Sequence, residues 1–194
     1  MKLIIASNNA HKLTEIKAIL GGRFEEILSL REAGIDHETV EDGRSFYENA
    51  RKKAWEIMTI SGYCALADDS GLCVDALGGA PGIYSARFSG VHGDDAANRR
   101  TMLEKLEGVT DRAAHYTCCM VLIRPDGSEL SAQAEFHGQI GHSEIGENGF
   151  GYDPIFFIPQ YNCTMAQLPP ETKNSVSHRH LALRELLSKL EAEV

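Results

Sequence analysis

Two adjacent carboxylates, Asp68 and Asp69, follow a short apolar run and precede Ser70. Oxygen ligands of this kind suit Mg²⁺, which keeps several waters and binds largely through substrate phosphates. We expect the pair at the end of a strand, where open α/β sheets bind ligands. The same dipeptide is also typical of a polar turn. Glu41 and Asp42 could supply a further carboxylate, although a solvated loop is the favoured interpretation of these two residues alone.

Lys53 is a cation on the apolar side of a predicted helix. A capping pattern, Ser45 followed by Glu48, predicts that this helix begins there and runs to about Ile60. Lys53 falls inside the apolar stripe of that helix, and Asn49 lies one turn earlier on the same side. A lysine that points inward requires an anionic partner or a wet pocket. The alternative is a lysine at the edge of the stripe whose ammonium reaches water.

Lys12 and Arg179 both fall in the first turn of a predicted helix, and Ser7, Asn8 and Asn9 form the polar cap before Lys12. The helix dipole disfavours cations there unless an anion or polar acceptor is also present. Free N–H groups together with a cation make a natural phosphate site. An exposed side chain that tolerates a small penalty remains the alternative.

An aromatic loop contains Phe150, Gly151, Tyr152 and Asp153. Two aromatic rings around a glycine suit stacking on a flat ring, and the aspartate could accept hydrogen bonds from ring N–H groups. From the residues alone, aromatic side chains that fill the core are the favoured interpretation. Further donors cluster near the start of the last predicted helix, at Lys173, Ser177, His178 and Arg179.

The elements that must position these residues alternate early in the chain. Apolar runs predict strands over 2–6, 24–30 and 63–67, with helices after the caps at 7–9 and 45. We expect the third strand to end at Asp68, followed by turn-rich chain with a short strand at 73–75. A helix follows Asp94 or Asp95 through about 106, a hairpin pairs 115–123 with 129–137, and residues 138–175 are irregular. The last helix starts near 175 or 177. This order predicts a mixed-sheet α/β fold with two lobes around a cleft.

Composition narrows the class of protein. The 194 residues suffice for one domain of ordinary size, and the formal charge of −9 argues against a protein that coats nucleic acid or anionic lipid. A phosphorylated substrate would need a local basic pocket, a divalent cation or both. Five cysteines without a CxxC pair predict reduced thiols. Since no signal peptide or membrane-spanning run is visible, we expect a soluble cytoplasmic protein.

Five segments together resemble the ITPase/HAM1 family, the pyrophosphatases of noncanonical purine nucleoside triphosphates. In order they are SNNAHK at 7–12, EDGRSFYENARKKA at 41–54, ADDSGLCVDALGGAPGIYSARFSG at 67–90, FGYDPIF at 150–156 and SHR at 177–179. The resemblance covers nearly the whole chain, so residues 1–194 are expected to form one such domain. The aromatic residue at 152 is Tyr, where some relatives have Trp.

The resemblance implies an elongated two-lobed α/β fold with a central substrate cleft, usually in a homodimer. It implies Mg²⁺-dependent hydrolysis of ITP, dITP and XTP to the monophosphate and pyrophosphate. By the same resemblance Ser7, Asn8, Asn9, Lys12 and Lys53 contact the triphosphate. Glu41 and Asp69 hold the metal, with Asp68 beside them, and Asp69 is the usual choice for the base that activates water.

The remaining roles concern the nucleobase. The resemblance implies that Ser70 binds substrate, and that Phe150, Gly151 and Tyr152 hold the purine with Asp153 nearby. Lys173, Ser177, His178 and Arg179 would recognise the edge of the base. From the residues alone we would place Arg179 on phosphate, whereas the family places it at the 6-oxo group. Spacing does not decide between these two roles.

Two other functions stay open at this point. The chain could be a metal-dependent phosphohydrolase of other nucleotides, which the released product would distinguish. It could also be a non-catalytic nucleotide sensor, although Glu41, Asp68, Asp69 and Lys53 are all present. Neither nucleic-acid polymers nor membranes are expected partners.

Overall fold

The alternation of strands and helices at the start of the chain produces parallel strand pairs. In the computed structural model, which describes residues 1–193, β1 (Lys2–Ile5) pairs in parallel with β2 (Glu26–Ser29) and with β3 (Cys64–Val74). The strand order is β2-β1-β3-β4-β5-β6-β7. The later strands are β4 (Ala113–Ile123), β5 (Glu129–Ile140), β6 (Phe156–Ile158) and β7 (Cys163–Thr164). The predicted mixed sheet is confirmed.

The chain divides into two units. Unit 1 comprises Met1–Asp69, Cys118–Ala134 and Arg179–Val194, and unit 2 comprises Ser70–Thr117 and Glu135–His178. Each unit has its own buried apolar core. No helix within residues 1–193 is both long and apolar enough to span a bilayer.

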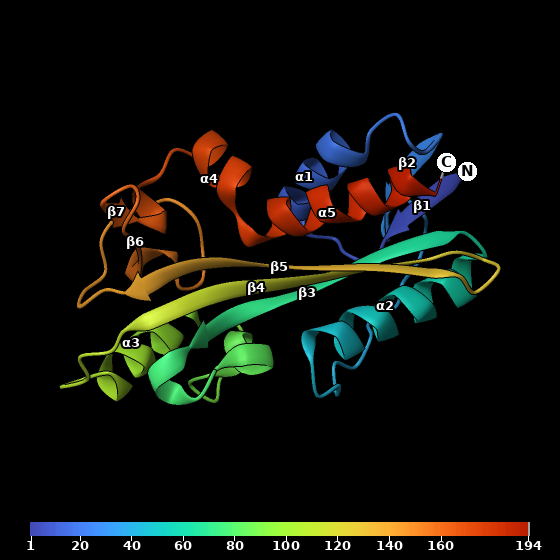
Figure 1. The fold of residues 1–194 in the computed structure, drawn as a ribbon. Coiled ribbons are helices and arrows are strands. Elements are labelled where there is room, and N and C mark those ends of the chain that lie inside the picture. The colour runs from blue at the N-terminus through green and yellow to red at the C-terminus, as the bar shows by residue number, and fades with distance from the viewer. Residues whose placement is uncertain (194) are drawn as a thin grey trace. The chain divides into compact units, whose positions relative to one another are not determined.

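Unit 1 packs helices on both faces of its strands (Figure 1). One core contains side chains of α1 (Ala10–Leu20) and α5 (His178–Ala192), and the other contains side chains of α2 (Phe46–Ser61). Along β3, Cys64 and Leu66 belong to the first core, whereas Ala65 and Ala67 belong to the second. Since successive strand side chains alternate between faces, Asp68 and Asp69 lie on opposite faces of the sheet.

The expected end of the third strand at Asp68 is wrong. β3 continues to Val74 and so includes residues 73 and 74 of the predicted short strand at 73–75, whereas Asp75 begins a 3₁₀ turn, η1 (Asp75–Leu77). Polar residues in the middle of the strand suggested a turn, but Asp68 and Asp69 are buried and have charged or amide partners there. A strand can carry buried carboxylates when each is compensated in this way.

Local caps fix the two helices that carry site residues. Asn9 Oδ1 accepts from the Lys12 N–H at 3.2 Å, which confirms the predicted cap of α1. Ser45 Oγ accepts from the Glu48 N–H at 3.1 Å, so α2 begins where predicted. The capping pattern also predicts that the Glu48 side chain accepts a hydrogen bond from the Ser45 N–H. That part of the prediction is wrong, because Glu48 Oε2 accepts from the Arg44 N–H instead.

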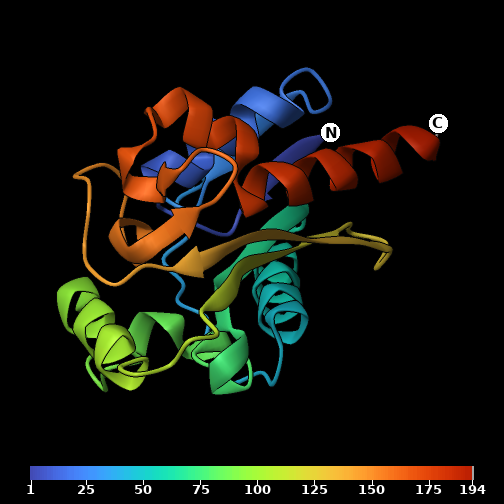
Figure 2. The ribbon, with the colours of Figure 1, turned by 60° about the vertical axis from the view of Figure 1, so that its left-hand side comes forward.

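Unit 2 contains α3 (Asp95–Lys105) and α4 (Pro170–Val176), on either side of its strands in Figures 1 and 2. The hairpin turn is confirmed, since the Gly127 N–H donates to the Arg124 carbonyl at 2.9 Å. The expectation of irregular chain over 138–175 is wrong in part. This stretch holds the end of β5, the short strands β6 and β7, and α4, elements too short to show a hydrophobic period.

Candidate active site

Asp68 is the anion of the face that carries α1 and α5. Its Oδ2 accepts a hydrogen bond from Lys12 Nζ at 2.8 Å and lies 3.6 Å from Arg179 Nε. Burial would raise the pKa of this carboxyl, but Lys12 and Arg179 outweigh burial and hold the pKa well below its usual range. Asp68 is therefore ionised at neutral pH, and its charge is compensated within unit 1.

Asp69 lies on the other face, against α2. Asn49 Nδ2 donates to Asp69 Oδ2 at 2.9 Å, and Asn49 Oδ1 accepts from the Gly43 N–H at 2.8 Å. A Cβ added at Gly43 would come within 2.6 Å of that amide oxygen, so the close approach requires glycine. The loop before α2 thereby fixes the orientation of the Asn49 amide and, through it, of the carboxylate.

Lys53 has the anionic partner that its place in the apolar stripe predicted. Its side chain is 14% exposed, and Nζ lies 2.8 Å from Glu41 Oε1. Burial alone would lower the pKa of Lys53, but Asp68, Asp69 and Glu41 raise the pKa above its ordinary value. The ammonium thus stays charged next to three carboxylates, which gives this cluster a fixed cation for an incoming phosphate.

The pKa of Asp69 shifts in the direction opposite to that of Asp68. Burial raises it, Lys53 and Asn49 offset part of this rise, and Glu41 and Asp68 add to it by repulsion. A buried carboxylate with a raised pKa holds a proton more readily than a surface one, which is the property of a general base. Of the two neighbours, Asp69 fits that role.

Glu41 and Asp69 also fit a divalent cation. Burial is the main cause of the raised pKa of Asp69, and repulsion by Glu41 adds to it, so a bound cation would stabilise both carboxylates. Their donor atoms are carboxylate oxygens, the ligands that Mg²⁺ prefers. The residues present therefore suit the magnesium ion that the sequence resemblance implied.

The loop between β1 and α1 holds the predicted triphosphate residues in place. Ser7 Oγ accepts from the Asn9 N–H at 3.1 Å, and Asn8 Oδ1 accepts from the Arg31 N–H at 3.0 Å. With Lys12 on Asp68, these residues surround the N-terminus of α1 in unit 1. The start of an α-helix together with a lysine is chemically suited to phosphate.

In unit 2 the predicted base-binding residues gather around Asp153. Its Oδ2 accepts from Lys173 Nζ at 2.5 Å and from the Phe150 N–H at 2.9 Å, and Tyr116 Oη lies 3.4 Å from Oδ1. Gly149 has φ +83°, and a Cβ there would lie 2.1 Å from Asp153 Oδ2. The loop therefore wraps closely around this buried carboxylate.

The two aromatic rings of the loop have different surroundings. Tyr152 is 4% exposed, belongs to the core of unit 2 and donates from its hydroxyl to the Ser85 carbonyl at 2.8 Å. Phe150 is 53% exposed, and Lys173 Nζ lies 4.6 Å from its ring centroid. Between them Gly151 is fixed by Asp95, which accepts from its N–H at 2.8 Å. The exposed face for stacking is thus that of Phe150.

The remaining predicted residues fall in both units. Ser70 is half-buried on β3, and Ser177 is buried at the end of α4. The His178 ring stacks on Tyr116 in unit 2, with centroids 4.9 Å apart. Arg179 belongs to unit 1, where its Nη1 donates to Glu15 Oε2 at 3.2 Å in addition to its contact with Asp68.

Three residues of these networks received no role from the sequence. Glu15 pairs with Arg179, Gly43 holds Asn49, and Asn49 was expected only to face the site. Asn49 carried a signal, because it lies one helical turn before Lys53. Nothing in the spacing of Glu15 or Gly43 pointed to their partners.

Comparisons with known proteins agree along the whole chain. The model of the Ham1 family matches residues 3–189. A "dITP/XTP pyrophosphatase" of Clostridium perfringens is 47% identical, with 97% of each chain covered, and one of Leuconostoc mesenteroides is 50% identical, with 98% and 96% covered. The Ham1 protein of Staphylococcus aureus has a TM-score of 0.93 at 40% identity, with both chains fully covered. A structure titled "Nucleoside-triphosphatase / dITP/XTP pyrophosphatase" from Mycobacterium abscessus has a TM-score of 0.82 at 43% identity, covering 96% and 99%. This chain, in which Asn49 donates a hydrogen bond to Asp69, belongs to the Ham1 family.

Proposed function

We propose that this protein hydrolyses ITP, dITP and XTP to the nucleoside monophosphate and pyrophosphate. The observation that carries the proposal is the cluster of Lys53, Glu41, Asp69 and Asn49, in which Asp69 and Asn49 are buried and which combines a fixed cation, two carboxylates and an orienting amide. Relatives of similar length are named dITP/XTP pyrophosphatases, which supports this substrate class.

The triphosphate binds to unit 1 in this proposal. Lys12 and Lys53 contact phosphate oxygens, and Ser7, Asn8 and Asn9 present polar groups at the N-terminus of α1. Both lysines are already positioned by carboxylates, Asp68 and Glu41 respectively. Cations held in place before the substrate arrives stabilise the charge that develops on the leaving pyrophosphate without further reorganisation.

Glu41 and Asp69 hold Mg²⁺ in the proposed complex. The ion, when bound, neutralises phosphate charge and lowers the pKa of bound water. Asp69 accepts the proton of the water that attacks the α-phosphorus, as the bond to the pyrophosphate oxygen breaks. The raised pKa of Asp69 supports this role. Asp68, with its lowered pKa, instead anchors Lys12 and Arg179.

The base binds to residues of unit 2 and to Arg179, which directly follows Ser177 and His178 in the sequence. Phe150 offers an exposed ring for stacking, while Tyr152 supports the loop from the core with Gly151 and Asp153. Lys173, Ser177, His178 and Arg179 supply donors, and Ser70 adds a polar contact. Hypoxanthine and xanthine carry a hydrogen-bond acceptor at position 6, whereas adenine carries a donor there. The protein's donors would therefore be left unpaired against adenine.

The experiment is a panel of ITP, dITP, XTP, GTP, ATP, CTP and UTP with Mg²⁺, in which pyrophosphate and phosphate are measured separately. The proposal expects pyrophosphate from ITP, dITP and XTP, with little from the others. Release of orthophosphate would indicate another metal-dependent phosphohydrolase. Nucleotide binding without any product would indicate a sensor.

We also propose that the enzyme acts in the cytoplasm as a homodimer. The five cysteines are unpaired, as expected in a reducing compartment. Light scattering of the purified chain tests the dimer, because a monomeric mass would contradict it.

A further inference from the structure

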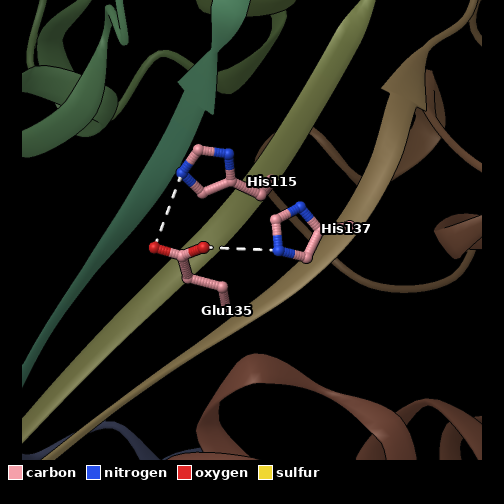
Figure 3. A group of neighbouring side chains, drawn as sticks. All are labelled: His115, Glu135 and His137. Atoms are coloured by element: carbon pink, nitrogen blue, oxygen red, sulfur yellow. Dashed lines mark ion pairs between the residues drawn. The ribbon is translucent and has the colours of Figure 1, made fainter.

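A second group of chemically capable side chains lies in unit 2, apart from the residues assigned above. His115 comes from β4, and Glu135 and His137 come from β5 (Figure 3). Among the side chains that the structure describes, this is the one group of three or more His, Cys, Asp or Glu residues whose possible ligand atoms all lie within 4.8 Å of one another. None of the three has a role in the proposed hydrolysis.

Strand pairing brings the three residues together. At the turn the Arg124 N–H donates to the Ser128 carbonyl, and at the other end of the hairpin the Ile140 N–H donates to the Arg112 carbonyl. These two hydrogen bonds define the same pairing register of β4 with β5. That register places His137 directly opposite His115, with Glu135 two residues along on the same face. The ring centroids of His115 and His137 are 5.2 Å apart. The backbone therefore places the three side chains next to one another on one face of the hairpin.

The carboxylate of Glu135 lies between the two rings, with one oxygen toward each (Figure 3). Oε1 is 3.9 Å from His115 Nε2, and Oε2 is 3.3 Å from His137 Nε2. Donors bound to one tetrahedral ion at about 2.0–2.1 Å lie roughly 3.4 Å from each other. The side chains of Glu135 and His137 are 41% and 70% exposed, so small rotations of these two side chains can bring the ligand atoms to that spacing without moving the core.

A fourth residue, Asp75, lies near the other ring nitrogen of His115. Its Nδ1 lies 3.8 Å from Asp75 Oδ1, on the side of the ring away from Glu135. A carboxylate that accepts a hydrogen bond from Nδ1–H selects the tautomer whose Nε2 is free to bind a metal, the usual arrangement of metal-ligating histidines. Asp75 is about 1 Å beyond hydrogen-bond distance and half exposed, so a small side-chain movement would let it take this position.

We propose that His115 Nε2, His137 Nε2 and the Glu135 carboxylate bind one divalent transition-metal ion of the Zn²⁺ class, with Asp75 orienting His115. Two imidazoles and one carboxylate form a set that zinc and its neighbours prefer, whereas Mg²⁺ prefers oxygen ligands alone. The ion would bridge β4 and β5 and so stabilise the hairpin. The inference stands independently of the proposed hydrolysis, since the two share no residue.

The test is calorimetric titration of the full chain with Zn²⁺ in saturating Mg²⁺, which occupies the oxygen-ligand site. The unsubstituted chain should bind one Zn²⁺. His137→Ala removes an exposed ligand and should weaken binding by at least about 100-fold, since metal affinity depends on the full ligand set. Asp75→Asn should weaken binding by roughly 10–100-fold. The matched control is His92→Ala, which removes another exposed histidine and should leave the affinity unchanged.

Thermal unfolding gives a second readout. Zn²⁺ should raise the Tm of the unsubstituted chain and of His92→Ala, but not of His137→Ala, because only binding to the folded state stabilises it. Circular dichroism without metal should show that all the variants are folded alike. Equal Zn²⁺ affinity in the unsubstituted chain and His137→Ala, or no binding by the unsubstituted chain, would overturn the proposal.

Discussion

Two neighbouring aspartates have opposite electrostatic environments in this protein. Asp68 is held by Lys12 and Arg179, which lower its pKa, whereas burial raises the pKa of Asp69 despite Lys53. The sequence identified both residues, yet could not say which one is suited to accept a proton. Their separation on opposite faces of β3 explains the difference, because each carboxylate contacts a different set of helices.

At the residue scale, Asp69→Asn tests the general base. We expect kcat for pyrophosphate release to fall by about 10²–10⁴-fold, the usual worth of a positioned acid or base. Nucleotide binding, measured by calorimetry, should persist because the lysines remain. If kcat is unchanged, Asp69 is not the base.

Lys53 has a matched control in its own neighbour. Lys53→Gln should lower kcat by about 10²–10³-fold, since it removes a fixed cation from the developing charge. Lys52, which pairs with Asp42 on the outer side of α2, should tolerate the same change to Gln with activity within about twofold. Steady-state kinetics on ITP measures both, and equal losses would contradict the role of Lys53.

Arg179 tests base selectivity. Because its guanidinium is buried against Asp68 and Glu15, Arg179→Lys keeps the charge while removing the planar fork of donors. We expect the ratio of kcat/KM for ITP over ATP to narrow by about tenfold, as one hydrogen bond to the base is lost. The same ratio in both proteins would place Arg179 on the phosphate or in a purely structural role.

At the element scale, the sequence predicted those helices that have clear caps and a clear apolar period. It failed at β3, where Asp68 to Gly71 suggested a turn but tertiary contacts keep the chain extended. It also failed at 138–175, where β6 has only three residues and β7 two. The sequence predicted an anionic partner or a wet pocket for Lys53, but the identity of the partner as Glu41 depends on how the loop before α2 folds back, which no local pattern encodes.

The start of α2 matters because this helix carries both Asn49 and Lys53. Ser45→Ala removes the side-chain acceptor for the Glu48 N–H and should lower the free energy of unfolding by about 1 kcal/mol. Urea denaturation measures the change. Thr59→Ala, on an exposed position of the same helix, should stay within about 0.5 kcal/mol. If Thr59→Ala lowered the free energy of unfolding as much as Ser45→Ala, the loss in Ser45→Ala could not be attributed to the helix cap.

At the scale of the whole molecule, carboxylates whose pKa shifts on folding set the dependence of stability on pH. A carboxyl whose pKa is lowered on folding stabilises the native state above its unfolded pKa of about 3.9, and this contribution is lost as pH falls further. Asp68 behaves in this way, and so does Glu32, whose hydrogen bonds from Ser29 and Lys17 lower its pKa to about 2. Asp69 has the opposite sign, because its raised pKa means that ionisation at neutral pH costs stability.

Neighbouring substitutions should therefore change stability in opposite directions. In metal-free buffer at pH 7, Asp68→Asn should lower the free energy of unfolding, because Lys12 and Arg179 lose their counter-ion. Asp69→Asn should leave the free energy unchanged or raise it. On acidification from pH 5 to pH 2, Asp68→Asn should lose stability less steeply than the unsubstituted chain. Denaturant titrations at each pH measure these changes, and parallel curves for all three proteins would contradict the assignment.

The central claim is that this chain splits ITP, dITP and XTP at the α-phosphorus. The most direct measurement is pyrophosphate release from these three nucleotides and from ATP and GTP, with Mg²⁺, by the unsubstituted protein and by Asp69→Asn. The account predicts strong release from ITP, dITP and XTP, little from ATP and GTP, and almost none by the variant. Equal release across the panel would contradict the base selectivity, and no release from any nucleotide would contradict the proposed reaction itself.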